Sequence, residues 1–326
     1  MGVAALLWIS TAAWALAKPL VVTTVAPITN IVSNVGGERV EVEGIIPEGQ
    51  DSHIFEPRPS DAQLLTQADL IIINGLALEE PTRQLAAASK KPGTKIQLLG
   101  DNTISRQEWI FDFSFPEADG KPNPHLWVNP RHAATYAKLA AQWLTELDPA
   151  GNEYYAKNLQ SYLARLEALD DVTKSVVDSI PPQNRKLLTY HDSWAYWAKD
   201  YGFEIIGAIQ PSDFNEPSAQ DMAKLIDLIK QANVPAIFGS EVFPSKVVDQ
   251  IARETQIKAA NTSDDDLPGD GSADAMENTM NPEHTYIGMM INNLRILAGN
   301  LGGDPSLLAG FDSRNVVGPH AISGNP

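Results

Sequence analysis

The alternation of short β-branched runs with helix-like segments constrains the fold of this 326-residue chain more than any other feature. Residues 19–25 form an apolar, β-branched run that is typical of a buried parallel strand, and residues 26–36 then have a helical pattern. Residues 40–46 and 69–75 predict two more strands, with capping residues and helical spacing at residues 59–68 between them. This order predicts an α/β fold, in which helices cover the faces of a parallel sheet.

A long amphipathic segment interrupts the alternation in the middle of the chain. Its apolar residues recur every three or four positions, and Pro181-Pro182 ends it, so we expect one helix of about 28 residues and roughly 40 Å. The apolar stripe consists of Leu159, Leu163, Leu166, Leu169, Val172, Val176 and Ile180. Strand and helix patterns resume afterwards at residues 186–190, 203–208, 221–232, 234–239 and 286–297.

These patterns predict two α/β lobes, residues 18–148 and 182–326, connected by the long helix within residues 149–181. An ordinary packed helix inside a single domain is the alternative interpretation of the same segment. We expect the protein to be a monomer.

The first seventeen residues are uncharged and apolar, and they end in the small-x-small pattern Ala15-Leu16-Ala17. This pattern predicts that residues 1–17 are a signal peptide, with a buried helix as the alternative. The chain has no cysteine, which excludes disulfides, thiolate zinc sites and a lipidated cysteine at the cleavage point. We therefore expect an exported, soluble protein of the periplasm that is not lipid-anchored.

Acidic residues outnumber basic ones by 41 to 24, which gives a net charge of −17. Nucleic acids and anionic membranes would repel such a chain, whereas cations would be attracted. The sequence therefore indicates no nucleic-acid partner. Solubility alone is an equally good explanation of the charge.

Three of the six histidines lie in short loops beside predicted strands. His53 lies in residues 47–57, His125 in residues 123–130 and His191 in residues 188–194. Neutral imidazole is the commonest protein ligand for a metal such as zinc, so these loops raise the hypothesis of a metal site. The three are too far apart for a local motif, and each alone could equally be a structural residue. The acidic loop at residues 263–269 could supply a carboxylate as the fourth ligand, although such loops are often merely solvated.

Four ordered segments resemble the zinc- and manganese-binding solute receptors of ABC importers. Three of them begin at the histidines: His-Ile-Phe-Glu-Pro-Arg-Pro-Ser-Asp at 53–61, His-Leu-Trp-Val-Asn-Pro at 125–130 and His-Asp-Ser-Trp-Ala-Tyr-Trp at 191–197. The fourth, residues 286–294, resembles the helix that follows the family's aspartate ligand. Together they span essentially the whole chain after the signal peptide.

The resemblance implies two lobes joined by a rigid helix, with a metal ion in the cleft between them. It implies that His53, His125, His191 and one aspartate hold the ion. Counting from the flanking motifs favours Asp266, followed by Asp265 and then Asp264. Manganese receptors of the family commonly have glutamate at the position of His191, and three imidazoles with one carboxylate suit zinc better than a harder ion. Zn²⁺ is therefore the predicted ligand, with Mn²⁺ as the alternative.

The predicted function is a zinc receptor that delivers Zn²⁺ to an ABC permease driven by a separate ATPase subunit, without covalent chemistry. Many zinc receptors of the family have a long histidine-rich loop before the second ligand, whereas residues 115–123 of this chain are short and contain no histidine. Metal would therefore arrive directly or from a periplasmic donor protein. A secreted zinc hydrolase, with Glu56 or Asp192 as its base, is the rival from another class. A surface adhesin of the same fold is the third possibility.

Other residues near the predicted site have supporting roles in this interpretation. Trp127 and Trp194 are expected to exclude water and fix the ligand loops. His132 and His284 are expected to have surface or capping roles. His320 lies in the tail, where a weak secondary ligand is the alternative to a terminus without a fixed structure.

Overall fold

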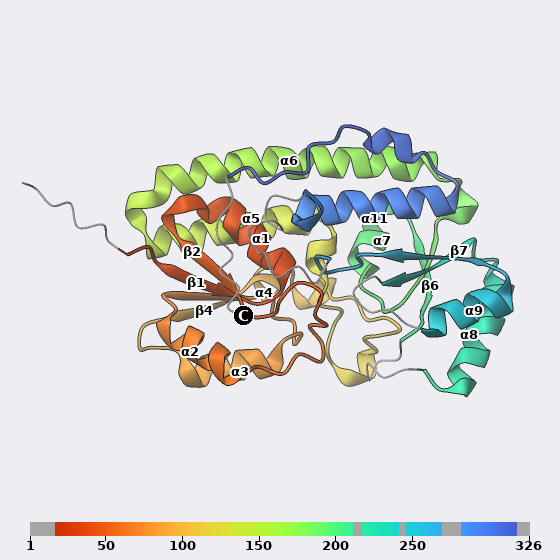
Figure 1. Cartoon of the computed structure of the whole chain (residues 1–326), viewed down its shortest axis with the longest axis horizontal. Helices are drawn as coiled ribbons and strands as arrows, with labels where there is room; N and C mark the ends of the chain where they lie inside the picture. Colours follow the sequence, from red (N-terminus) through yellow and green to blue (C-terminus); the bar gives the residue numbers. More distant parts are fainter. Residues whose placement is uncertain (1–16, 211–216, 241–245, 269–281, 318–326) are drawn as a thin grey trace, which may run out of the picture.

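The computed structural model describes residues 17–210, 217–240, 246–268 and 282–317. Two α/β lobes lie side by side beneath one long helix that runs along both of them (Figure 1). The predicted signal peptide, apart from residue 17, and His320 lie outside the described residues. Within the described ranges, no helix combines the length and the apolar character needed to cross a bilayer.

The N-terminal lobe is built on a four-stranded parallel sheet in the order β2-β1-β3-β4. The strands are β1 (Leu20–Thr23), β2 (Glu41–Gly44), β3 (Leu70–Ile73) and β4 (Lys95–Leu98). All four side chains of β3 are buried, because helices cover both faces of the sheet, and this explains its unbroken apolar run. The helices of this lobe are α1 (Ala26–Gly36), α2 (Pro59–Gln67), α3 (Glu80–Ser89), α4 (Leu99–Thr103) and α5 (Pro130–Leu147).

The C-terminal lobe repeats this arrangement with the order β6-β5-β7-β8. Its strands are β5 (Lys186–Thr189), β6 (Glu204–Ala208), β7 (Ala236–Ser240) and β8 (Lys258–Thr262). Its helices are α7 (Ala195–Tyr201), α8 (Ala219–Ala232), α9 (Lys246–Thr255) and α11 (Tyr286–Leu301). Because each sheet is parallel, the loops that follow its strands all leave from one edge.

The long helix α6 (Asn152–Ser179) has 28 residues and packs against α1 and α5 of the first lobe and α11 of the second. The predicted fold class, two parallel α/β lobes with one long helix, is therefore confirmed. The exact lobe boundaries at residues 148 and 182 remain predictions.

The buried face of α6 is rotated slightly from the predicted stripe. Tyr155 and Tyr162 are buried, whereas Leu159 and Leu163 only partly contact the core. Both tyrosines belong to the apolar core, and a pattern built on aliphatic residues alone misses them.

Candidate metal centre

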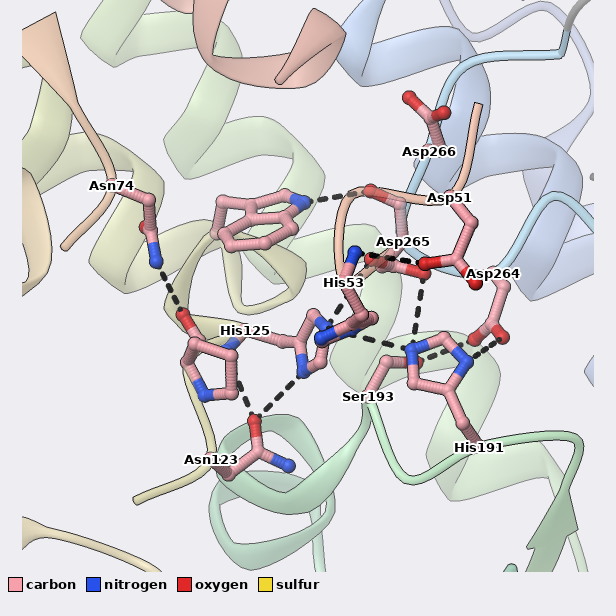
Figure 2. Close-up of polar contacts among 12 residues, drawn as sticks. Asp51, His53, Asn74, Asn123, His125, His191, Ser193, Asp264, Asp265 and Asp266 are labelled. Atoms are coloured by element: carbon pink, nitrogen blue, oxygen red, sulfur yellow. Dashed lines mark hydrogen bonds and ion pairs between the residues drawn. The ribbon is translucent and has the colours of Figure 1, made fainter. Parts of the chain in front are cut away.

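The three predicted histidines meet at the interface between the lobes. His53 lies in the loop after β2, and His125 lies just before the short 3-10 helix Leu126–Val128 that precedes α5. His191 follows β5 directly, and Asp265 lies in the loop after β8. The ligand atoms of these four side chains all lie within 4.8 Å of one another (Figure 2). Three of the side chains are buried, and His53 is half-buried, so it forms the outermost wall of the cluster.

The distances within the cluster are those of atoms arranged around one small ion. The Nε2 atom of His125 lies 3.1 Å from Nε2 of His53 and 3.4 Å from Nε2 of His191. Asp265 Oδ2 is 3.3 Å from Nε2 of His125, and Asp265 Oδ1 is 3.4 Å from Nε2 of His191. Four ligands placed tetrahedrally about 2.0–2.1 Å from a zinc ion lie about 3.3 Å apart, so these residues fit that ion.

The structure places Asp265 with the histidines, where the sequence favoured Asp266. Figure 2 shows the Asp266 carboxylate pointing away from the three imidazoles. Its Oδ1 atom accepts a hydrogen bond from the Leu267 N–H at 2.8 Å. Burial and the nearby Asp265 carboxylate raise the pKa of Asp266 well above its usual value. The expectation that Asp266 completes the cluster is therefore corrected to Asp265, the second choice from the sequence.

Asp264 supports the cluster from behind. Its Oδ2 atom lies 3.2 Å from Nδ1 of His191, the ring nitrogen that faces away from the other imidazoles. Its Oδ1 atom accepts hydrogen bonds from the Ser193 hydroxyl and from Nε1 of Trp194. The Asn293 side chain on α11 donates to the Asp264 carbonyl at 2.8 Å, so the loop is anchored to a helix. This carboxylate therefore orients His191.

Trp127 and Trp194 take the positions expected of them beside the cluster. The Trp127 ring lies 5.2 Å from that of His125, and its Nε1 donates to the Asp265 carbonyl at 2.8 Å. Both indoles are almost completely buried. They shield the cluster from water and fix the loops that hold the candidate ligands.

Burial and charge act differently on the three imidazoles. Burial, reinforced by the neighbouring imidazoles, holds the pKa values of His53 and His125 well below the usual range. Burial opposes the charged form of His191 too, but the carboxylates of Asp264 and Asp265 outweigh it and raise the pKa of His191 to about 10. One histidine is therefore protonated at neutral pH when no metal is bound.

The remaining histidines of the described residues lie outside the cluster. His132 is half-buried in the first turn of α5, where its ring lies 5.6 Å from that of Tyr196. His284 is buried, and its Nδ1 lies 2.6 Å from Glu48 Oε2. Of the expected surface or capping role, the surface position is wrong for His284, because its side chain is buried and contacts Glu48 of the other lobe; the capping role stays a prediction.

Sequence reasoning missed the residues that hold the ligands from behind. The sequence motifs indicate Asp264 only as a possible ligand, and they indicate no role for Asn123. Their positions in the sequence are the only signal that could have identified them: Asp264 directly precedes Asp265, and Asn123 lies two residues before His125. Neither position distinguishes an orienting side chain from an ordinary loop residue.

Comparison with known proteins gives consistent matches over most of the chain. Residues 21–300 match the family described as "Zinc-uptake complex component A periplasmic". The chain is 31% identical over 284 residues to the zinc-binding protein TroA of Treponema pallidum, which covers 87% of this chain and 89% of that protein. It is 27% identical to the manganese-binding lipoprotein MntA of Halalkalibacterium halodurans, over 86% of this chain and 88% of that protein. It is also 28% identical to the iron-binding protein YfeA of Yersinia pestis, over 86% of each.

The same similarity is present at the level of structure. The solved structure of the periplasmic zinc-binding protein TroA from Treponema pallidum superposes with a TM-score of 0.77 at 27% identity. The match covers 87% of this chain and 99% of that chain. The two lobes and the helix between them are therefore a shared architecture.

Proposed function

This chain belongs to the periplasmic zinc-uptake component A family of metal receptors of ABC importers, and from that premise we propose that Zn²⁺ is the ion it carries. Family membership confirms the resemblance drawn from the sequence motifs. It also confirms that the protein is a transport receptor rather than an enzyme, so the hydrolase hypothesis built on Glu56 or Asp192 is set aside.

One observation carries the choice of zinc: three imidazole nitrogens and one carboxylate converge within 4.8 Å of one another, and His125 and Asp265 make contacts of 3.1–3.4 Å with the other members. Three nitrogen donors suit zinc better than manganese, which prefers oxygen ligands and octahedral coordination. Asp265 Oδ1 is buried and accepts no hydrogen bond. Its charged neighbour is Nε2 of His191 at 3.4 Å, and a metal cation between them would take over that role. We therefore assign His53, His125, His191 and Asp265 as the zinc ligands.

The relatives name different metals, so the alternative is a manganese receptor. MntA is a manganese-binding protein, and YfeA is an iron-binding protein. A manganese site would need additional oxygen ligands beyond this set. The carboxylate of Asp265 is the one oxygen donor in the cluster.

Delivery requires partners that receive the ion. Receptors of this family serve ABC importers, so the implied partners are a membrane permease and its ATPase subunit. We further propose that the exported chain acts as a monomer in the periplasm without a lipid anchor, and that metal comes directly or from a donor protein. Proton release on binding provides a route for exchange, because zinc and protons compete for the imidazole nitrogens.

The test is metal content by mass spectrometry together with competition titrations of Zn²⁺ and Mn²⁺ against a chromophoric chelator. Wild type, His191→Ala and the neighbouring Asp266→Ala form the set. We expect one equivalent of zinc that manganese does not displace, weakened by His191→Ala and much less by Asp266→Ala. Protein that binds manganese in preference to zinc would overturn the assignment of the ion.

A further inference from the structure

A histidine that binds metal through one ring nitrogen makes a hydrogen bond through the other. The partner in that hydrogen bond decides which of the two nitrogens carries the proton and which is free to bind metal. A neutral imidazole carries its proton on one nitrogen, and the other nitrogen offers the lone pair. For His125 the partner is Asn123, which is completely buried and lies two residues earlier. The inference that follows rests on the proposed function, because it concerns the same site.

The orientation of the Asn123 amide is fixed by its surroundings. Nδ2 lies 2.7 Å from Asp112 Oδ2, and it also donates to the backbone carbonyl of Asp192. A backbone carbonyl can only accept, so the amide NH₂ must face it. Oδ1 is therefore the atom that faces His125, 2.9 Å from its backbone N–H and 3.0 Å from its Nδ1.

This orientation determines the tautomer of His125. An amide oxygen cannot donate, so Nδ1 of His125 must carry the proton. Nε2 is then free of a proton and points at His53, His191 and Asp265 (Figure 2). The tautomer that binds metal is set before the metal arrives.

The same amide also connects the ligands of the two lobes. Its acceptor Asp192 directly follows His191 in the C-terminal lobe, whereas His125 belongs to the N-terminal lobe. The Tyr196 hydroxyl on α7 donates to the Asn123 carbonyl at 3.1 Å and reinforces this connection. We propose that Asn123 is a positioning residue for zinc: it selects the metal-binding tautomer of His125 and holds that imidazole in register with the His191 loop.

The first variant is Asn123→Ala, which removes the acceptor of the Nδ1 proton. Loss of such an outer partner typically weakens metal binding by about 10- to 100-fold, and we expect that range here. Asn129→Ala is the matched control. Asn129 is also completely buried, and it donates to the Tyr196 carbonyl and to Asp200 across the same interface, but none of its hydrogen bonds reaches a proposed ligand. We expect it to lower the stability while zinc affinity stays close to wild type.

A second variant separates tautomer control from simple structural damage. The double substitution Asp112→Asn with Asn123→Asp exchanges the two side chains, so their mutual hydrogen bond and the total charge are kept. The new carboxylate at position 123 still accepts from Nδ1, and it makes the imidazole more basic. We expect zinc affinity above that of Asn123→Ala, because the acceptor of the Nδ1 proton is kept. It should stay below wild type, because the new carboxylate and the Asp192 carbonyl are both acceptors and repel each other.

Nitrogen-15 NMR of the metal-free protein supplies the readout that a merely structural role would not move, because bound zinc would itself force the proton of His125 onto Nδ1. In wild type and in the exchanged variant, we expect a hydrogen-bonded proton on Nδ1 of His125 and none on Nε2. In Asn123→Ala the Nδ1 proton should exchange quickly with water. Zinc affinity is measured in parallel by chelator competition.

The outcomes separate this inference from the proposed function. A wild-type protein that binds no zinc refutes the proposed function. If wild type binds zinc but Asn123→Ala binds it as tightly as Asn129→Ala does, the positioning role of Asn123 is refuted. If Asn123→Ala does not fold, the exchanged variant decides, because a metal-free His125 that carries its proton on Nε2 despite a retained acceptor at Nδ1 would contradict the inference.

Discussion

Zinc binding should release a proton from His191 between about pH 7 and pH 9. Without metal, burial disfavours the charged imidazole, but Asp264 and Asp265 outweigh burial and raise the pKa of His191 to about 10. The ring nitrogens face these carboxylates at 3.2 Å and 3.4 Å. Zinc must take Nε2, so the proton on that nitrogen has to leave.

The magnitude follows from counting protons. His53 and His125 are already neutral in this pH window, because burial holds their pKa values well below the usual range. One proton is therefore released for each ion bound. Zinc affinity should rise about tenfold for each pH unit, or about 1.4 kcal/mol, and should fall by the same factor as the pH is lowered.

Isothermal titration calorimetry at pH 8, in buffers that differ in ionisation enthalpy, counts the released protons directly. We expect about one proton per zinc ion. The matched variant is Asp264→Asn, which keeps the shape of the side chain but removes one of the three charges, those of Asp264, Asp265 and Asp51, that raise the pKa of His191. Its proton release at pH 8 should be smaller. No proton release by wild type, with affinity that is flat from pH 7 to 9, would refute the reasoning.

Three further predictions follow from the site and its surroundings. Asp265→Ala should weaken zinc binding by more than the roughly 100-fold that loss of an outer hydrogen-bond partner costs. Asp266→Ala should weaken zinc binding less than Asp265→Ala does. Chelator competition measures both affinities, and the reverse order would contradict the geometry of the cluster. Trp127→Ala should lower the free energy of unfolding by about 3–5 kcal/mol, because the indole is completely buried and donates a hydrogen bond to the Asp265 carbonyl. Urea unfolding in the presence of a chelator measures this free energy. An unchanged value would contradict the packing of Trp127 described above. The metal-free protein should lose stability as the pH rises from about 7 to 10, because His191 still binds a proton in the folded protein whereas the unfolded chain has released it. Thermal unfolding across this pH range measures the change in stability. Stability that rises with pH would contradict the prediction.

Much of the fold could be predicted because it depends on local patterns. The apolar run of β3 and the alternation around it predict a parallel sheet, and helix α6 has the predicted length. The histidine loops could be linked to one site only through the resemblance of their motifs to the family of metal receptors. Strand geometry could not link them, because His53 follows β2 of one sheet and His191 follows β5 of the other. The register of the α6 stripe was less predictable, because tyrosine carries both an apolar ring and a polar hydroxyl.

The choice among three consecutive aspartates could not be made from the sequence. Asp264 adopts a left-handed backbone conformation with φ of 59°, which turns the loop so that successive side chains point in different directions. Asp264 then faces the rear of His191, and Asp265 faces the imidazoles. Only the turn in three dimensions, and not the spacing from other motifs, distinguishes these roles.

The most direct test of the central claim is a crystal structure of the zinc-loaded protein, with anomalous diffraction data collected on both sides of the zinc absorption edge. We predict one anomalous peak about 2.0–2.2 Å from Nε2 of His53, His125 and His191 and from the carboxylate of Asp265. A peak bound by Asp266 instead of Asp265, or no zinc between the three imidazoles, would contradict the account.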